Sequence, residues 1–227
     1  MHLCTRYSGV VVHIGVRARA LYSGKYKTTW KGVELMKDAL DLVILQSLIY
    51  SERPVTIFEL GTYSRGSALW LADIARSFDF RCHVYSIDIS FECLHEKAKS
   101  NKDITFLLAD ASKDMEKVLP TEKLKEMPHP WFITEDCHVP LEDSVGYLEK
   151  FMIPGDYLLV EDTHPSINRL IGQGLYTPGF DEAGFAKYNI LKAFVEARPG
   201  KFMVDQHYTD FFGYNASTSM NSYLKRV

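Results

Sequence analysis

The chain has 227 residues, of which 46% are hydrophobic, 24% charged and 13% aromatic. Such a chain buries a sizeable core without disulfides, so neither a disordered protein nor a disulfide scaffold is expected. Its 26 Lys and Arg against 29 Asp and Glu give a formal net charge of −3, which supplies no polyanion-binding surface. We therefore expect no nucleic-acid partner.

The four cysteines are scattered along the chain without a CxxC pair, which excludes a zinc knuckle and a redox motif. No run approaches the ~20 apolar residues of a membrane span. The N-terminus also lacks the pattern of a signal peptide. The expectation is a cytoplasmic protein with reduced cysteines and no membrane partner.

Residues 1–32 carry many aromatic, basic and glycine residues and little periodicity. We interpret them as an arm or lid, lying over the site or on a neighbouring subunit, and we expect a homo-oligomer. Apolar residues at helical spacing then predict one long helix over residues 33–50. Residues 33–227 form one domain in this interpretation.

From residue 55 onward, short apolar strands alternate with helical segments. Strands are predicted at residues 55–60, 83–88, 104–109, 131–134 and 157–160. Helices are predicted at residues 64–78, 91–100, 141–151 and 190–197. Towards the C-terminus we expect a loop over residues 172–184 and an antiparallel strand pair at 202–205 and 210–214. Hydrophobic strands separated by helices indicate an α/β fold, a doubly wound, Rossmann-like sheet.

Ligands of such sheets bind beyond the carboxyl ends of the strands. The first strand ends in Glu59-x-Gly61-x-x-x-x-Gly66, whose glycines let the backbone approach a ligand closely. Asp88 ends the second strand, where a carboxylate accepts hydrogen bonds from ribose hydroxyls. The third strand continues into Asp110 and Ala111, placed to reach an adenine. Together the three strand ends indicate a nucleoside ligand.

A dinucleotide site requires G-x-G-x-x-G, and the middle glycine is missing between Gly61 and Gly66. The pattern resembles that of S-adenosylmethionine-dependent methyltransferases, whose cofactor has no pyrophosphate. The alternative is that both glycines only form a tight turn. The predicted cofactor contacts are Glu59, Gly61, Thr62, Tyr63, Ser64, Gly66, Ser67, Asp88, Asp110, Ala111 and Glu135.

Acidic residues close the fourth and fifth strands, as Glu135-Asp136-Cys137-His138 and Glu161-Asp162-Thr163-His164. Four carboxylates at one crevice repel each other unless a cation joins them or some take up protons. Oxygen ligands at this density suit a hard divalent ion, Mg²⁺ before Ca²⁺. The alternative is a set of solvated acids that cap the following helices.

Further motifs are Thr29-Trp30-Lys31-Gly32, Lys37, Asp41 and the terminal Asn221-Ser222-Tyr223-Leu224-Lys225-Arg226. With the strand ends above, they resemble the cephalosporin hydroxylase family from about residue 28 to the end. Members of that family look like metal-dependent S-adenosylmethionine O-methyltransferases of natural-product biosynthesis, including antibiotic biosynthesis. The resemblance implies methyl transfer to a hydroxyl of a small-molecule acceptor.

The resemblance also implies roles for individual residues. Glu59, Gly61, Gly66 and Ser67 would line the cofactor, and Asp88 would hold its ribose. The divalent ion would be bound by Asp136, Glu161 and Asp162. Glu135 is the alternative to Asp136, because strand alternation sends the two to opposite sides. His138 is similar in placement to a catalytic base, and His164 competes for that role.

Two other functions remain open from the sequence. One is a nicotinamide-dependent oxidoreductase or hydroxylase component, against which the missing glycine and the lack of a His₂-carboxylate set argue. The other is a non-catalytic, cofactor-binding accessory subunit, against which the intact acidic strand ends argue.

Overall fold

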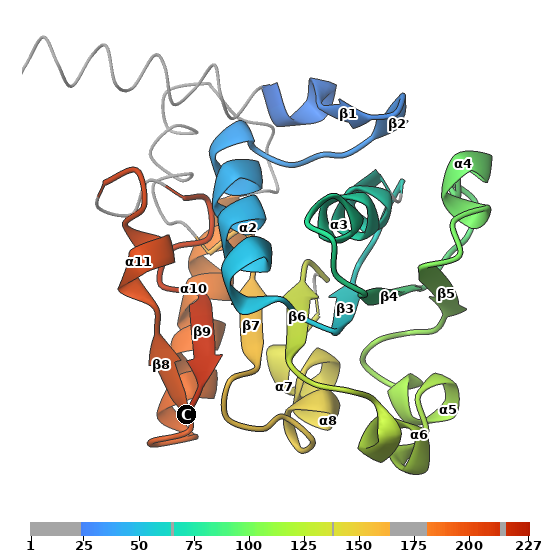
Figure 1. Cartoon of the computed structure of the whole chain (residues 1–227). Coiled ribbons are helices and arrows are strands. Elements are labelled where there is room, and N and C mark those ends of the chain that lie inside the picture. The colour runs from blue at the N-terminus through green and yellow to red at the C-terminus, as the bar shows by residue number, and fades with distance from the viewer. Residues whose placement is uncertain (1–23, 65, 138, 164–180, 214–216) are drawn as a thin grey trace, which may run out of the picture.

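The apolar strands of the sequence assemble into one mixed sheet. The computed structural model of the chain describes residues 24–64, 66–137, 139–163, 181–213 and 217–227, and of residues 181–186 the backbone only. Within these ranges the sheet has seven strands in the order β5-β4-β3-β6-β7-β9-β8 (Figure 1). They are β3 (Thr56–Leu60), β4 (His83–Asp88), β5 (Ile104–Leu108), β6 (Trp131–Glu135), β7 (Tyr157–Val160), β8 (Phe202–Val204) and β9 (Tyr223–Arg226).

Strands β3 to β7 are parallel, and β9 runs antiparallel to β7 and to β8. The order confirms the predicted α/β fold with a doubly wound, Rossmann-like sheet. From β3 the chain builds outward through β4 to β5 and then returns to place β6 on the other side of β3. Ligands of open α/β sheets bind where the strand order reverses, here between β3 and β6.

Helices cover both faces of the sheet. They are α2 (Ala39–Glu52), α3 (Gly66–Ser77), α4 (Glu96–Lys99), α5 (Met115–Val118), α6 (Thr121–Glu126), α7 (Leu141–Ser144), α8 (Gly146–Glu149), α10 (Asp181–Glu196) and α11 (Gln206–Thr209). Among the described residues, no helix is long and apolar enough to cross a membrane.

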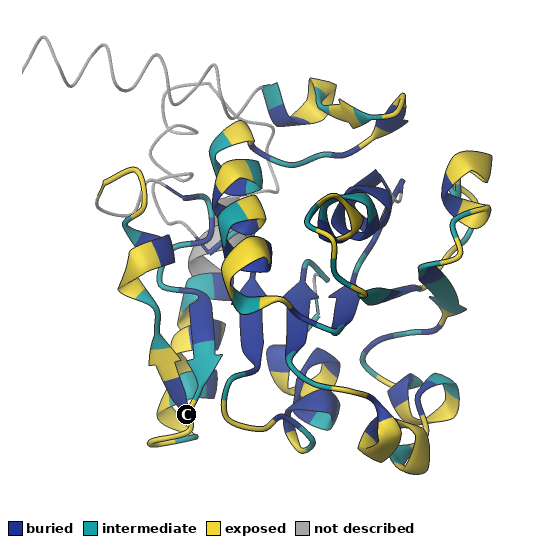
Figure 2. Cartoon of the chain, viewed as in Figure 1, coloured by how far each residue is buried: buried dark blue, intermediate teal, exposed yellow. Residues whose placement is uncertain are grey.

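Alternation along the central strands divides the core into two layers. Ile57 of β3 packs in the layer under α2 and α3, whereas Phe58 and Leu60 pack in the layer with α5 to α8 and α10. The central strands are buried and the outer helix surfaces exposed (Figure 2). Polar side chains at the strand ends therefore also point to one face or the other.

The prediction of a helix over residues 33–50 is wrong at its start. A 3₁₀ turn, η1 (Lys25–Lys27), precedes a hairpin of β1 (Thr29–Trp30) and β2 (Val33–Glu34). Lys31 and Gly32 join these strands with φ of 52° and 81°, as a two-residue hairpin turn requires. Helix α2 begins only at Ala39, where the Asp38 carboxylate accepts a hydrogen bond from the Leu40 amide at 2.8 Å. The hairpin spans the expected boundary between residues 32 and 33.

The hairpin is docked on α3. Trp30 Nε1 donates a hydrogen bond to Asp73 Oδ2 at 2.7 Å. A Cβ atom added to Gly66, the first residue of α3, would lie 2.1 Å from the carbonyl oxygen of Glu34. Gly66 is therefore required by the close approach of the two backbones.

The C-terminal part also departs from expectation. The strand predicted at residues 210–214 is wrong over 210–213, and residue 214 lies outside the described ranges. Instead α11 follows β8, and Asp205 caps its first turn by accepting a hydrogen bond from the His207 amide at 3.0 Å. The antiparallel partner of β8 is β9. Of the expected loop, residues 172–180 lie outside the described ranges, and 181–184 begin α10, which is longer than the helix predicted at 190–197. The helix predicted at 91–100 shortens to α4, and that at 141–151 divides into α7 and α8.

Candidate active site

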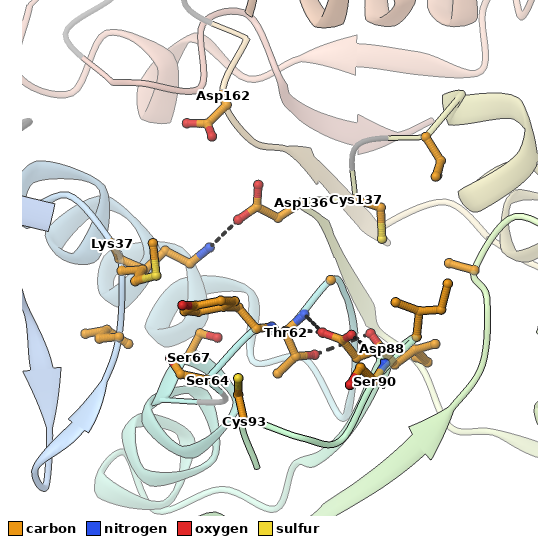
Figure 3. Close-up of a pocket in the computed structure, with 18 of the residues that line it drawn as sticks. Lys37, Thr62, Ser64, Ser67, Asp88, Ser90, Cys93, Asp136, Cys137 and Asp162 are labelled. Atoms are coloured by element: carbon orange, nitrogen blue, oxygen red, sulfur yellow. Dashed lines mark hydrogen bonds and ion pairs between the residues drawn. The ribbon is translucent and has the colours of Figure 1, made fainter. Parts of the chain in front are cut away.

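A cavity of about 760 Å³ opens beyond the carboxyl ends of the parallel strands, at the reversal point between β3 and β6 (Figure 3). It brings together most of the residues that the sequence singled out. Those in its lining are Gly61, Thr62, Tyr63, Ser64, Ser67, Asp88, Asp110, Ala111, Asp136 and Asp162. Four others, Glu59, Gly66, Glu135 and Glu161, lie outside the lining.

The turn after β3 is held by the end of β4. The amides of Thr62 and Tyr63 each donate a hydrogen bond to Asp88 Oδ2 at 2.9 Å, and the Ser90 amide donates to Oδ1 at 3.0 Å (Figure 3). The Asp88 carboxylate thus fixes the backbone of two strand ends while it faces the cavity. A structural role accompanies the predicted contact with ribose.

Gly61 lies where the β3 turn passes the backbone of β6. Its φ is 83°, and a Cβ atom would lie 2.8 Å from both the carbonyl carbon and the oxygen of Asp136. This glycine is required both by its left-handed conformation and by the neighbouring backbone. The wall of the cavity therefore has no side chain between the two strand ends.

Glu59 is buried behind the wall, with 3% of its surface exposed. Ser67 and Ser86 donate hydrogen bonds to its carboxyl group, and burial raises its pKa to about 7. Its Oε2 atom finds no hydrogen-bond partner among the described residues. It adjoins a void of about 10 Å³, large enough for one water molecule, which Lys37 and Glu161 also line.

Strand alternation separates the two acids at the end of β6. Glu135 points toward α10, where its Oε2 atom lies 3.3 Å from Lys187 Nζ and its Oε1 accepts from the Cys137 amide at 2.9 Å. Burial raises the pKa of Glu135 to about 7. Asp136, the next residue, lines the cavity. Between the two acids that the sequence left open as an ion ligand, the geometry favours Asp136.

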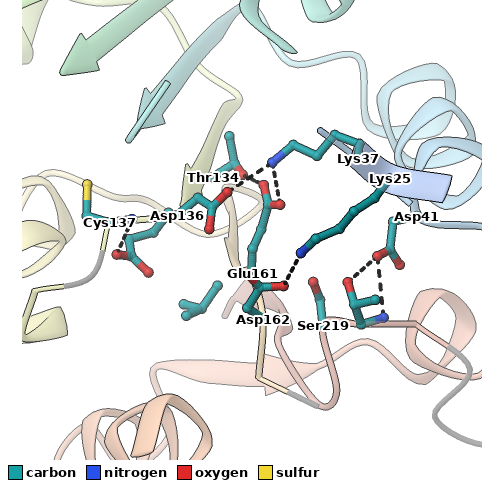
Figure 4. Close-up of polar contacts among 12 residues, drawn as sticks. Lys25, Lys37, Asp41, Thr134, Asp136, Cys137, Glu161, Asp162 and Ser219 are labelled. Carbon is teal, nitrogen blue, oxygen red and sulfur yellow. Dashed lines mark hydrogen bonds and ion pairs between the residues drawn. The ribbon is translucent and has the colours of Figure 1, made fainter. Parts of the chain in front are cut away.

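Two lysines from the segment before α2 contact the other acids (Figure 4). Lys37 Nζ lies 3.4 Å from Asp136 Oδ2 and also forms an ion pair with Glu161 Oε2. Lys25 Nζ lies 3.6 Å from Asp162 Oδ1. Burial alone would lower the pKa of Lys37, but the charges of Glu161 and Asp136 raise it above its ordinary value, so the amine stays charged.

The acidic strand ends therefore carry counter-ions of their own. Four carboxylates face three ammonium groups, those of Lys25, Lys37 and Lys187. Among the described residues, no three His, Cys, Asp or Glu side chains converge as a metal-ligand group. The oxygen donors nevertheless fit a hard divalent ion, and the Lys37 ammonium already places a positive charge between two of them.

Asp41, also singled out in the sequence, is structural. Its Oδ1 atom accepts a hydrogen bond from Ser217 Oγ at 2.6 Å, and its Oδ2 accepts from the Thr218 hydroxyl. Burial raises the pKa of Asp41 to about 6. The residue joins α2 to the segment before β9.

Several residues of the cavity were not anticipated, and the two predicted bases, His138 and His164, lie outside the described residues. Lys37 and Cys137, which the sequence named within motifs without a role, also line the cavity. The unanticipated lining residues are Lys25, Tyr26, Leu35, Met36, Ile87, Ile89, Ser90, Glu92, Cys93 and Val139. Many of them follow a strand end or lie between the hairpin and α2, where neither periodicity nor a motif marks them. Burial raises the pKa of the Cys137 thiol, which excludes a ready thiolate there.

Comparison with known proteins identifies the family. The pattern of the Rhamnosyl O-methyltransferase/CmcI family matches residues 22–227. A Rhamnosyl O-methyltransferase of Mycobacterium tuberculosis (strain ATCC 25618 / H37Rv) is 27% identical over 206 residues, which cover 88% of this chain and 78% of the relative. That of Mycobacterium leprae (strain TN) is 25% identical, over 88% of this chain and 83% of the relative.

Solved structures agree with this. A structure described as CmcI with Mg and SAM superimposes with a TM-score of 0.67 and 25% identity, over 89% of this chain and 77% of the other. The O-methyltransferase TomG from Streptomyces achromogenes, with a TM-score of 0.52 and 18% identity over 88% and 89% of the two chains, shares the fold. The chain therefore belongs to the Rhamnosyl O-methyltransferase/CmcI family and is an S-adenosylmethionine-dependent O-methyltransferase.

Proposed function

We propose that this enzyme methylates a hydroxyl of a small-molecule natural product, using S-adenosylmethionine and a divalent ion, Mg²⁺ before Ca²⁺. The observation that carries the proposal is a single cavity that joins the β3 turn and Asp88 to Asp136 after β6 and Asp162 after β7. The curated relatives are named for a rhamnosyl acceptor, which favours a hydroxyl on a sugar-bearing molecule. The homo-oligomer and the cytoplasmic location stay predictions from the sequence.

In this proposal the β3, β4 and β5 ends bind the cofactor. The Asp88 carboxylate accepts hydrogen bonds from the ribose hydroxyls, each contributing ~1.5–3 kcal/mol because the acceptor is charged. The backbone of residues 61–64 follows the methionine part of the cofactor. Asp110 and Ala111 lie at the adenine.

The residues that would hold the ion are Asp136, Glu161 and Asp162. A divalent ion supplies Lewis-acid chemistry, since it lowers the pKa of a hydroxyl and orients it. Asp136 takes precedence over Glu135 because it shares the Lys37 ammonium with Glu161, whereas Glu135 contacts Lys187 on the other face of the sheet.

Proton removal is assigned to His138, with His164 as the competitor, on their sequence positions after the acidic strand ends. A histidine base works best near neutral pH. We expect His138→Ala to lower kcat by ~10²–10⁴ with little change in cofactor affinity. If His164 is the base, the two alanine variants exchange phenotypes. Wild-type rates in both variants from pH 6 to 8 would exclude a histidine base.

Two measurements test the function. In calorimetric titrations, S-adenosylhomocysteine should bind and NADH should not. Binding of NADH but not of S-adenosylhomocysteine would favour the alternative function, a nicotinamide-dependent oxidoreductase. With a sugar-bearing acceptor panel and labelled S-adenosylmethionine, EDTA should abolish methyl transfer while the circular dichroism spectrum stays unchanged. Full activity in EDTA would remove the ion from the mechanism.

A further inference from the structure

The backbone of Lys37 is fixed by hydrogen bonding to Thr28 and by the start of α2. The Lys37 amide donates a hydrogen bond to Thr28 Oγ1 at 3.3 Å, and this hydroxyl, which donates to the Lys25 carbonyl oxygen at 2.7 Å, also lies 3.1 Å from the Lys37 carbonyl oxygen. The next residue, Asp38, caps α2. The lysine side chain, 11% exposed, therefore extends from a fixed segment into the acidic strand ends.

The ammonium group joins two strands. It forms ion pairs with Asp136 after β6 and with Glu161 after β7 (Figure 4). Both oxygens of Glu161 are engaged, since Oε1 accepts from Thr134 Oγ1 at 2.8 Å and Oε2 contacts Lys37. A divalent ion that took Glu161 Oε2 as a ligand would replace the ammonium there.

The Lys37 ammonium and a divalent ion cannot occupy the same carboxylates at once, because both are positively charged. An ammonium and a divalent ion repel each other strongly at ligand distance in a buried site. Lys37 lines the cavity, so its flexible stem can carry the charge away from the carboxylates and toward bound ligands. Binding of the ion is then an exchange rather than the filling of an open place.

We propose that Lys37 is a resident counter-ion that competes with the divalent ion for Asp136 and Glu161 and so sets the metal affinity of the enzyme. The inference rests on the proposed function, in which these acids hold the ion. In this inference Lys37 lowers the affinity of the site for the ion, whereas the carboxylates are the ligands that bind it.

The other two lysines serve for comparison. Lys25 contacts one predicted ion ligand, Asp162, at 3.6 Å. Lys187 lies nearest to Glu135, outside the predicted ligand set, and is 3.8 Å from Asp136. Lys37 contacts two predicted ligands, so its removal should have the largest effect on metal affinity, followed by the removal of Lys25.

The test is calorimetric titration of the intact chain with MnCl₂ alone, without cofactor or acceptor. We expect Lys37→Met to bind Mn²⁺ at least ten-fold more tightly than the wild type, and Lys25→Met to show a smaller gain. Lys31→Met is the matched control: Lys31 pairs with Asp73 on α3, at 2.7 Å, and lies outside the cavity lining, so its affinity should stay within two-fold of the wild type. Adding Asp136→Asn to Lys37→Met should abolish the gain.

A second neutral variant covers the case in which Lys37→Met does not fold. Lys37→Gln retains a hydrogen-bond donor toward the carboxylates without the charge, and it should also bind Mn²⁺ more tightly than the wild type. Mn²⁺ affinity in the neutral variant equal to or weaker than that of the wild type overturns the competition and leaves the proposed function standing. Absence of Mn²⁺ binding in the wild type and in every lysine variant overturns the ion site itself.

Discussion

The cavity rim has two halves, one at the ends of β3 and β4 and one at the ends of β6 and β7, and they stabilise carboxylate groups in different ways. At the ends of β3 and β4, the charge of Asp88 is stabilised by backbone amides of neighbouring turns. At the ends of β6 and β7, four carboxylates are balanced by lysine side chains from η1, from the segment before α2 and from α10. The first half joins two consecutive strand ends, 25 and 26 residues apart, whereas the Lys37 contacts of the second half span 99 and 124 residues. A change in the first half should act on cofactor binding and a change in the second on catalysis.

The largest expected effect is at the acidic half, for Asp162→Asn. Asp162 has a φ of 58°, which Asn adopts readily, so the substitution removes charge without straining the backbone. We expect kcat to fall by at least about a hundred-fold, as loss of an ion ligand exceeds the 10–100-fold cost of disturbing its supporting contacts. The affinity for S-adenosylhomocysteine, measured in EDTA by calorimetry, should stay within two-fold.

Asp79→Asn is the matched control for Asp162→Asn. Asp79 has nearly the same φ, 57°, and is an exposed residue outside the cavity lining, so both constants should be unchanged. Full activity of Asp162→Asn would show that Asp162 is not an ion ligand. A parallel loss of cofactor affinity would show that the two halves are not separable.

The next prediction concerns Gly66, where the β1–β2 hairpin packs against α3 beside the cofactor half of the rim. Gly66→Ala should lower the free energy of unfolding by about 1–3 kcal/mol, because its Cβ would overlap the Glu34 carbonyl and force the hairpin away from α3. Urea unfolding measures the change. Gly24→Ala, whose Cβ would meet no described atom within 4 Å, is the control. Equal stability of the two variants would contradict the close approach.

Asp88→Ala should weaken S-adenosylhomocysteine binding at least ten-fold, about 1.4 kcal/mol, since it removes a charged acceptor from the ribose site. It also leaves the amides of Thr62 and Tyr63 without their acceptor, so the turn loses order. Asp88→Asn, which retains a carbonyl for the turn, separates the two effects by keeping stability while losing affinity. An unchanged dissociation constant in both variants would remove the nucleoside contact from Asp88.

The smallest functional effect is expected for Glu59→Gln, since Glu59 lies behind the wall: cofactor affinity should stay within two-fold. Its folded-state pKa of about 7 exceeds the ordinary 4.5, so the stability that its proton contributes is full below pH 4.5 and is lost as the pH rises through 7. Relative to the wild type, the variant should gain unfolding free energy between pH 5 and 8, with a slope of up to about 1.4 kcal/mol per pH unit. Parallel urea-unfolding profiles would contradict the buried, protonated state.

The parallel strands were predictable because each is a continuous apolar run, whatever its partners. The start of α2 was not, because Lys31 and Gly32 form a hairpin turn that helical spacing of apolar residues does not reveal. Strand β9 was missed for a similar reason: its position between β7 and β8 depends on long-range pairing.

The same distinction applies to the site. Asp88 and Gly61 were found because Asp88 is the last residue of β4 and Gly61 directly follows β3. Lys37 was named as a motif residue, but its role as a counter-ion was not predicted, since Lys37 and Glu161 are 124 residues apart and nothing local marks their contact. Glu59 is the first residue of the glycine motif, yet strand alternation places its side chain under α3. The motif therefore predicted the position of Glu59 along the chain but not its burial.

The bare backbone contact between Gly61 and Asp136 has a thermodynamic consequence. A ligand that shifts the β3 turn presses directly on the carbonyl of the residue proposed to bind the ion, because no side chain lies between to absorb the movement. If the ion binds as proposed, the two binding equilibria are linked through this contact, and linkage is reciprocal. The factor by which the ion changes cofactor affinity must equal the factor by which the cofactor changes ion affinity, so saturation with one determines how much of the other the enzyme needs.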